Sequence, residues 1–360
     1  MKVALVYDRV NKWGGAERVL LALHKLFPEA PLYTSVYHKK NAGWADAFAI
    51  QTSFLQKIPG VSSRHEIIPF LMPLAFEQFS FDRYDLVISV TSESAKGILT
   101  KPHTKHICYC LTPTRYLWSG YQTYFPSRLM QLAAKPTVNA LRNWDKAAAH
   151  RPDQMIAISE EVSKRIKKYY DRDAMVIYPP TDLGESYNPM KKKTKNKNGD
   201  YFLIVSRLSN FTRYKRIDLA IEACSTLKVP LKVIGSGSWK KELQAKAGSS
   251  VEFLGSVSDE QLISYYENCR ALIFPGVEDF GLTIIEAQRF GKPVIAYRGG
   301  GSLETIKEGK TGIFFDKQTK KSLMEAIKAF EKIHFDSREA KRHFQKFSFE
   351  SFKKKFMGVV

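Results

Sequence analysis

Short apolar runs alternate with amphipathic helical patterns along the whole chain. In the first half the pattern predicts helices over Ala16–Leu26 and Glu160–Tyr170. The second of these follows Ser159, a residue type favoured at helix N-caps. The expected strands of this half are Val3–Tyr7, Leu86–Val90, His106–Tyr109, Met155–Ile158 and Val176–Tyr178.

The same rhythm restarts after residue 200. Here the expected strands are Phe202–Val205, Leu231–Ile234, Val251–Leu254, Ala271–Phe274 and Pro293–Tyr297, and the expected helices are Arg216–Thr226, Lys240–Ala247, Asp259–Glu267 and Leu282–Phe290. Strands that alternate with helices in both halves predict two Rossmann-like, doubly wound parallel sheets, an α/β architecture. Ligands of such folds bind at the carboxyl ends of the strands, so we expect a site in the cleft that the two domains face.

The stretch from Gly184 to Gly199 has no apolar periodicity and contains a run of lysines, which predicts a linker. We therefore expect domains at 1–183 and 200–335, a linker at 184–199, and terminal helices at 336–360 that could pack back on the first domain. The aromatic residues of this tail could form one side of those helices, with core packing favoured over membrane contact: Phe344, Phe347, Phe352 and Phe356.

The 360 residues carry 56 basic and 36 acidic side chains, a net charge of +20. This excess favours an anionic partner, which could be nucleic acid, an acidic membrane surface or a phosphorylated substrate. No nucleic-acid-binding module is visible, so we expect no nucleic-acid partner.

Segments that bear on metal binding and localisation are few. The four cysteines contain no C-x-x-C pair, so we expect buried, reduced thiols of a cytosolic protein and no zinc site. The apolar run at the N-terminus is too short for a signal peptide. The longest other apolar stretch, Ile67–Phe76, is about half a membrane span and contains two prolines, so no transmembrane helix is expected.

The most informative segment runs from Phe274 to Tyr297. A strand ends near Phe274, and a helix is expected to begin near Leu282 and to stop at Gly291. Free amides at Gly281, Leu282 and Thr283 would favour an anion such as a diphosphate. Two carboxylates flank them: Glu278 and Glu286 could accept hydrogen bonds from sugar diols, or could be solvated acids, and spacing alone does not decide.

Other candidates follow strand ends. Arg207 and Lys215, near the end of the first strand of the second half, could neutralise a diphosphate or could be surface charges. Gly14 and Gly15, after the first strand, could let the backbone approach a ligand or form a plain turn. The loop at Gly235 departs from a dinucleotide fingerprint because Lys240 stands where the third glycine belongs, which argues against a dehydrogenase. A donor-binding loop near the nucleotide is still expected at Gly235.

Together these segments resemble the family-4 retaining glycosyltransferases of the GT-B fold. The residues from Glu278 to Glu286 match the family's E-x7-E motif, and SRL…YKRID and GGAER match as well. The segments HICYCLTPTRYLW and VIYPPTD resemble the branch of O-antigen-type mannosyltransferases.

The resemblance implies a role for each matching position. Arg207 and Lys215 would bind the donor diphosphate and stabilise the leaving group, Glu278 would contact hydroxyls of the transferred sugar, and Glu286 would hold the ribose. Gly14 and Gly15 would approach the donor phosphate. The anomeric configuration would be retained, and no metal or other cofactor would be required. One departure is Leu111, where relatives usually have His.

The resulting hypothesis is a hexosyltransferase that moves a sugar, with mannose from a guanosine diphosphate donor as the best guess, to a glycan or lipid-linked acceptor in cell-surface polysaccharide synthesis. The alternatives are a noncatalytic nucleotide-sugar binder, an epimerase-like relative and a nucleic-acid-binding protein. The protein would be cytoplasmic, with peripheral contact to an acidic membrane as a further hypothesis. That contact rests on basic and apolar residues of the first half: Arg128, Leu129, Met130, Lys135, Leu141, Arg142 and Lys146.

Overall fold

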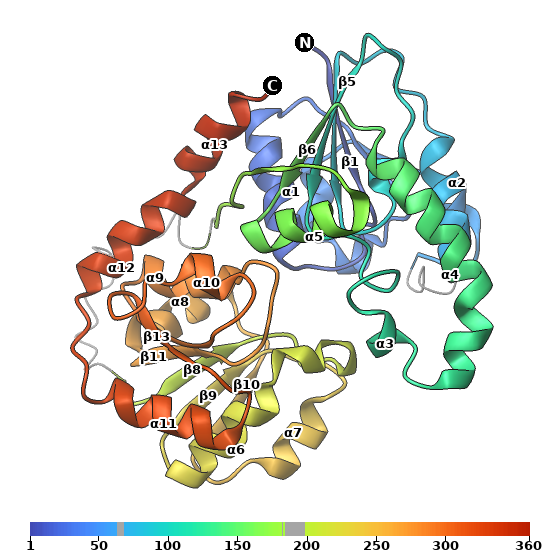
Figure 1. The fold of residues 1–360 in the computed structure, drawn as a ribbon. Helices are drawn as coiled ribbons and strands as arrows, with labels where there is room; N and C mark the ends of the chain where they lie inside the picture. The colour runs from blue at the N-terminus through green and yellow to red at the C-terminus, as the bar shows by residue number, and fades with distance from the viewer. Residues whose placement is uncertain (63–67, 182, 184–198) are drawn as a thin grey trace. The chain divides into compact units, whose positions relative to one another are not determined.

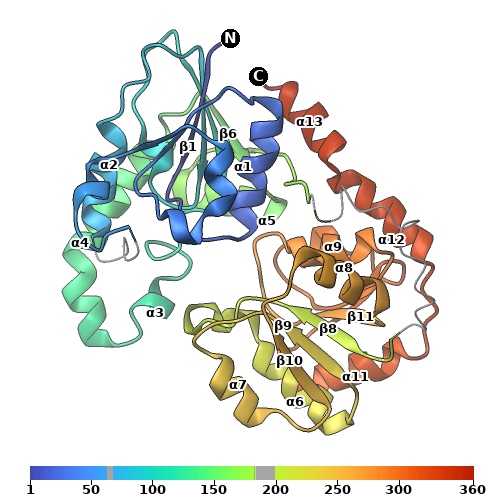
Figure 2. The same ribbon diagram turned by 180° about the vertical axis from the view of Figure 1, so that it is seen from behind.

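The computed structural model describes residues 1–62, 68–181, 183 and 199–360. These form two compact units, one of Met1–Pro180 together with Lys355–Val360 and the other of Thr181–Lys354 (Figures 1 and 2). Each unit contains one parallel sheet and is described by itself. The expected linker falls almost entirely on residues 184–198, which lie outside the described part of the chain.

Unit 1 is built on a seven-stranded parallel sheet of order β3-β2-β1-β4-β5-β6-β7. The chain first winds outward from β1 to β3 and then returns to β4 on the other side of β1. The carboxyl ends of β1 and β4 therefore border the topological switch point, where ligands of open α/β sheets bind. The strands are β1 Val3–Tyr7, β2 Leu32–Thr34, β3 Ile50–Thr52, β4 Leu86–Thr91, β5 Lys105–Cys110, β6 Gln154–Ala157 and β7 Met175–Val176.

The helices of unit 1 include the two that the sequence predicts. Ser159 caps the second of them, because its side chain accepts from the Val162 amide at 3.1 Å. No helix in the described ranges is long and apolar enough to span a membrane. The helices are α1 Gly15–Leu26, α2 Met72–Glu77, α3 Tyr121–Tyr124, α4 Arg128–Ala149 and α5 Glu160–Tyr170, with 3₁₀ turns η1 Lys39–Asn41, η2 Gly43–Ala47, η3 Phe54–Lys57, η5 Pro69–Leu71 and η6 Ala95–Gly97.

The last residues of the chain belong to unit 1. In α13 (Phe349–Met357), Phe356 is fully buried with its ring 6.3 Å from that of Tyr109. The Lys105 ammonium donates to the Val359 carbonyl at 2.7 Å. The four phenylalanines that the sequence singled out are buried, which agrees with core packing rather than membrane contact: Phe344, Phe347, Phe352 and Phe356.

Unit 2 has a six-stranded parallel sheet of order β10-β9-β8-β11-β12-β13, so its switch point lies between β8 and β11. One core packs α6, α7 and α11 on one face, and a second core packs α8 and α9 on the other (Figure 1). The strands are β8 Phe202–Val205, β9 Leu231–Ile234, β10 Val251–Gly255, β11 Ala271–Phe274, β12 Val294–Tyr297 and β13 Gly312–Phe315. The helices are α6 Ile217–Leu227, α7 Lys240–Lys246, α8 Asp259–Asn268, α9 Leu282–Arg289, α10 Ser302–Thr305, α11 Lys320–Phe330 and α12 Ser337–Phe344, with turns η8 Asn210–Lys215 and η9 Gln345–Phe347.

The two parallel sheets confirm the predicted fold class, although several elements were missed. Strands β2 and β3 have three residues each, which is too short for periodicity to reveal. Helix α4 contains Pro136, a residue that normally argues against a helix interior. The strand expected at Val176–Tyr178 is present only as Met175–Val176.

Candidate active site

Two residues predicted from motifs far apart in the sequence meet at the switch point of unit 2. Lys215 ends η8, after β8, and Glu278 lies in the loop after β11. The Lys215 ammonium donates to the Glu278 carboxylate at 2.8 Å, although 63 positions separate them. Their side chains are 13% and 25% exposed, so the pair is partly shielded and still open to a ligand.

Arg207 follows β8 at the same edge of the sheet. Its carbonyl accepts from the Thr212 hydroxyl at 3.0 Å, which fixes the loop, while its side chain is exposed. Within residues 199–360 its guanidinium has no ion pair. A guanidinium without a carboxylate partner, at a strand end, is suited to an anion.

The N-terminus of α9 lies after β11, as predicted. Gly281 is the N-cap with φ 90°, no side chain caps the helix, and its first turn contains no acid. The amides of Leu282 and Thr283 are therefore among the helix donors that an anion can satisfy. Gly291, with φ 73°, directly follows the C-cap Phe290, which confirms the predicted end of the helix.

Glu286 lies on the buried side of α9, with 4% of its surface exposed. The fully buried Tyr266 donates from its hydroxyl to Glu286 at 2.8 Å and stacks on Phe290 at 5.8 Å. This packing fixes the Glu286 side chain. Its contact with a ribose stays a prediction.

Glycines hold the loops of this edge against one another. Gly235 has φ 134°, and a Cβ there would lie 1.8 Å from the Ser206 carbonyl oxygen, so the loop after β9 packs directly on the loop that carries Arg207. A Cβ on Gly276 would lie 2.4 Å from the Cα of Lys215. The backbone conformation and the close packing therefore require glycine at position 235 whether or not a donor binds there. Contact of Gly235 with the donor stays a prediction.

Sequence reasoning missed the glycines after β12. The Gly301 amide donates to the Glu278 carbonyl at 2.9 Å. Gly300 has φ 63°, and a Cβ there would lie 2.5 Å from the same carbonyl oxygen. The run of three glycines at 299–301 was the available signal for this close approach of two loops.

In unit 1, Gly14 and Gly15 begin α1 directly after the loop that follows β1. The first turn of α1 contains Glu17, which is buried and accepts from the Tyr7 hydroxyl at 2.8 Å. A Cβ on Gly14 would lie 3.1 Å from a Glu17 carboxylate oxygen, so this helix terminus already has an anion beside it. The approach of Gly14 and Gly15 to a phosphate stays a prediction.

Leu111, where relatives usually have His, is partly buried directly after β5.

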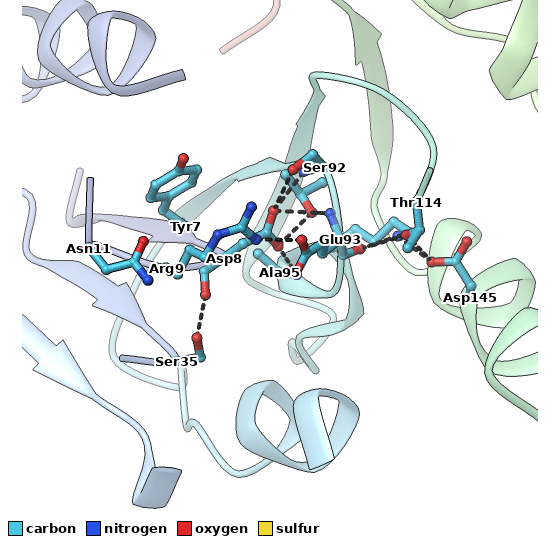
Figure 3. A network of polar contacts seen from close by, with 12 residues as sticks. Tyr7, Asp8, Arg9, Asn11, Ser35, Ser92, Glu93, Ala95, Thr114 and Asp145 are labelled. Carbon is cyan, nitrogen blue, oxygen red and sulfur yellow. Dashed lines mark hydrogen bonds and ion pairs between the residues drawn. The ribbon is translucent and has the colours of Figure 1, made fainter. Parts of the chain in front are cut away.

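A second charged cluster, which the sequence did not reveal, occupies the switch point of unit 1 (Figure 3). The buried Asp8 carboxylate, just after β1, accepts from the amides of Ser92 at 2.6 Å, Glu93 at 3.0 Å and Ala95 at 2.8 Å. Burial raises the pKa of Asp8, and the Glu93 carboxylate raises it further. Arg9 forms an ion pair with Glu93 beside it. The sequence does not reveal this cluster, because an isolated Asp-Arg pair after a strand matches no functional motif.

A buried ion pair joins this cluster to α4. Lys96 and Asp145 are 2.5 Å apart and each 1% exposed. Asp145 also accepts from the hydroxyls of Thr114 at 2.9 Å and Tyr170 at 2.8 Å. Burial alone would lower the pKa of Lys96, but the Asp145 carboxylate more than offsets this and the pKa is raised. The pair is fully satisfied, as buried charges must be.

Comparison with known proteins shows what the chain is similar to. Residues 188–346 match the family model of glycosyl transferases group 1. The chain is 25% identical to O-antigen chain mannosyltransferase C of Escherichia coli over 56% of its length and 54% of the relative's. It is 27% identical to an alpha-1,3/1,6-mannosyltransferase of Dictyostelium discoideum over 78% of its length and 76% of the relative's. The chain spans about half the length of the E. coli protein and of several other curated relatives.

Among solved structures, Anabaena HepE in complex with UDP and glucose superposes with a TM-score of 0.71 at 19% identity, covering 100% of this chain and 99% of that one. This likeness concerns the fold. The chain therefore has the two-domain GT-B fold, and its second half matches the family model of glycosyl transferases group 1. The mannosyltransferases among its relatives guide what is proposed next.

Proposed function

We propose that the protein is a retaining glycosyltransferase that moves a hexose, with mannose as the first candidate, from a nucleoside-diphosphate sugar to a glycan or lipid-linked acceptor. The observation that carries the proposal is the Lys215–Glu278 pair, together with the uncapped N-terminus of α9 and the exposed Arg207, which has no ion pair within residues 199–360. Cations, helix amides and one carboxylate at a switch point suit a diphosphate joined to a sugar.

In this proposal the bond between the sugar's anomeric carbon and the diphosphate oxygen breaks, and a bond from that carbon to an acceptor oxygen forms. The nucleoside diphosphate leaves with the bonding electrons, and the proton of the acceptor hydroxyl passes to an oxygen of the departing diphosphate. Arg207, Lys215 and the amides at Gly281–Thr283 would stabilise the charge that develops on the leaving group. Glu278, held by Lys215, would accept hydrogen bonds from sugar hydroxyls, and Glu286 would serve the ribose.

The first experiment measures thermal shifts and slow hydrolysis for a panel of nucleotide sugars. We expect one donor to stabilise the protein and to be hydrolysed, and both Glu278→Ala and Arg207→Ala to lose the hydrolysis. Lys232→Ala is a matched control, because Lys232 pairs with Glu252 away from the switch point. No response to any donor would contradict the proposal. Binding without turnover against a broad acceptor panel would favour a noncatalytic binder and direct attention to Leu111.

We also propose that one face of unit 1 contacts acidic membranes. The first turns of α4 expose Leu129 by 78%, Met130 by 47% and Leu132 by 66%, next to Arg128 and Lys135. Apolar side chains flanked by basic ones are typical of peripheral membrane contacts. Two residues of the hypothesis are turned inward: Leu141 is buried, and Arg142 donates to the Leu117 carbonyl at 2.7 Å. Lys146 is exposed and lies over the Trp118 ring.

Liposome sedimentation at low salt tests this contact. We expect binding to anionic vesicles that the pair Leu129→Ser and Leu132→Ser weakens severalfold. Leu303→Ser is the matched control, because Leu303 is 54% exposed in unit 2. Equal binding to neutral and anionic vesicles would count against the contact.

A further inference from the structure

Tyr266 joins two helices of unit 2 through the carboxylate of Glu286. Its hydroxyl, on α8, donates to an oxygen of Glu286, on α9, at 2.8 Å. Both side chains are buried, Tyr266 fully and Glu286 with 4% of its surface exposed. A buried carboxylate needs hydrogen-bond donors, and a phenol supplies one without adding a charge. The bond therefore helps to hold a charged group inside the core.

The phenol itself has little freedom. Helices α8 and α9 lie side by side on one face of the sheet (Figures 1 and 2). The Tyr266 ring stacks on that of Phe290, with the ring centroids 5.8 Å apart and the planes inclined by 13°. Phe290 is the C-cap of α9, so one end of that helix holds the ring whose hydroxyl holds Glu286. A side chain supported in this way is preorganised and loses little freedom when a ligand binds.

The bond to Tyr266 also determines what else Glu286 can bind. An ionised carboxylate only accepts hydrogen bonds, at about four positions on its two oxygens. The phenol fills one of these positions and leaves the carboxylate able to accept from further donors. A ribose offers such donors in its 2′ and 3′ hydroxyls. A deoxyribose that lacks one of them would leave an acceptor position of Glu286 unfilled, which is costly where water is scarce.

We propose that Tyr266 is a positioning residue that makes the nucleotide site select ribonucleotides over deoxyribonucleotides. It holds the Glu286 carboxylate where both ribose hydroxyls can donate to it. The inference rests on the proposed function, because the contact of Glu286 with the ribose is part of that function. Tyr266 acts through Glu286 rather than on the substrate.

Isothermal titration calorimetry of the full chain with GDP, UDP and their 2′-deoxy and 3′-deoxy analogues tests the inference. We expect the wild type to bind one of the two ribonucleotides at least about tenfold more tightly than a deoxy analogue of it. Tyr266→Phe keeps the ring on Phe290 and removes only the hydroxyl. It should reduce the preference to less than about threefold by weakening the ribonucleotide, with the Kd of the deoxy analogue kept within about twofold.

Tyr201→Phe is the matched control. Tyr201 is buried in the same core, and its hydroxyl donates to the Tyr265 carbonyl at 3.0 Å. Its loss should leave the preference for ribose unchanged. Glu286→Gln should also lose the preference, and the addition of Tyr266→Phe to it should change the preference no further, because the two residues act as one unit.

A preference that survives in Tyr266→Phe or in Glu286→Gln would overturn the inference. An equal loss of affinity for ribonucleotides and deoxyribonucleotides in Tyr266→Phe would also overturn it, because that result is expected of a residue that only packs. Equal binding of all analogues by the wild type would overturn it as well, while the nucleotide binding itself would agree with the proposed function. Binding of no nucleoside diphosphate would contradict the proposed function, and the inference would fall with it.

Discussion

The two switch points of the molecule are built alike but charged differently. In each, one cation from the loops after the first central strand pairs with one carboxylate from the loop after its neighbour: Arg9 with Glu93 in unit 1, and Lys215 with Glu278 in unit 2. In unit 2 an additional cation, Arg207, stands unpaired among the described residues. In unit 1 the additional groups are two buried acids, Asp8 and Glu17, and the buried Lys96, which pairs with Asp145.

The helix that follows each switch point shows the same contrast. The first turn of α9 contains no acid, so its amides are open to an outside anion. The first turn of α1 contains Glu17, whose carboxylate already lies beside the helix terminus. The same architecture thus carries different charges beside its two switch points, because a few loop positions differ.

The largest expected effect is on donor turnover, and it should distinguish Lys215 from Arg213, two cations of the same loop in unit 2. Lys215→Ala should lower donor turnover by about 10²–10³-fold, because it removes leaving-group stabilisation and releases Glu278. Arg213→Ala should change turnover little, since Arg213 pairs with Glu242 on the surface. Steady-state hydrolysis of the stabilising donor measures both. Equal losses would show that loop folding, rather than charge at the switch point, sets activity.

Substitution of a loop glycine by alanine should change stability more at Gly235 in unit 2 than at Gly14 in unit 1. Gly235→Ala should destabilise unit 2 by about 2 kcal/mol or more, because φ is 134° and the Cβ would meet the Ser206 oxygen. Gly14→Ala should alter stability by less than about 1 kcal/mol, because its φ of −178° suits any residue. Thermal unfolding of both variants tests this, and a tolerated Gly235→Ala would contradict the close packing of the loops.

Acid should destabilise unit 1 through His106. Burial, with Arg172 and Arg151 nearby, lowers the pKa of His106 to about 3. The unfolded state binds a proton below about pH 6.5 that the folded state refuses, so stability present above pH 6.5 falls as the pH falls, by roughly 2 kcal/mol at pH 5. Hydrogen exchange at pH 7 and pH 5 measures this, and His106→Asn should flatten the dependence.

The control for the acid effect is His103→Gln, because the His103 side chain is exposed in the turn before β5. It should leave the pH dependence of unit 1 unchanged. A dependence that persists in His106→Asn would mean that other groups, such as the Asp8 cluster, dominate acid unfolding.

The smallest expected effect is that of a chelator. If Arg207, Lys215 and the α9 amides supply the positive charge for the leaving group, donor turnover in EDTA should equal turnover in Mg²⁺. Continuous assay of released nucleoside diphosphate checks this. Activity that depends on Mg²⁺ would show that the basic edge of unit 2 is insufficient alone.

By itself the sequence determined the two parallel sheets, most long strands, and helices α1, α5, α6, α7, α8 and α9. It also supplied the donor-side candidates. These follow from local periodicity, caps and glycines, all encoded within a few neighbouring residues. Short strands such as β2 carry too few residues for such a signal. The motif at Glu278–Glu286 also marked its two acids, but could not show that one is partly open and the other buried.

Only the tertiary structure decided which charges meet. Lys215 and Glu278 are 63 positions apart, and Arg9 and Glu93 are 84 apart. Each pair forms because parallel strands that are distant in sequence end side by side where the sheet order reverses. Sequence reasoning assigned Asp8, Arg9 and Glu93 no role because their significance lies in that adjacency, which strand order sets and local residue pattern does not encode.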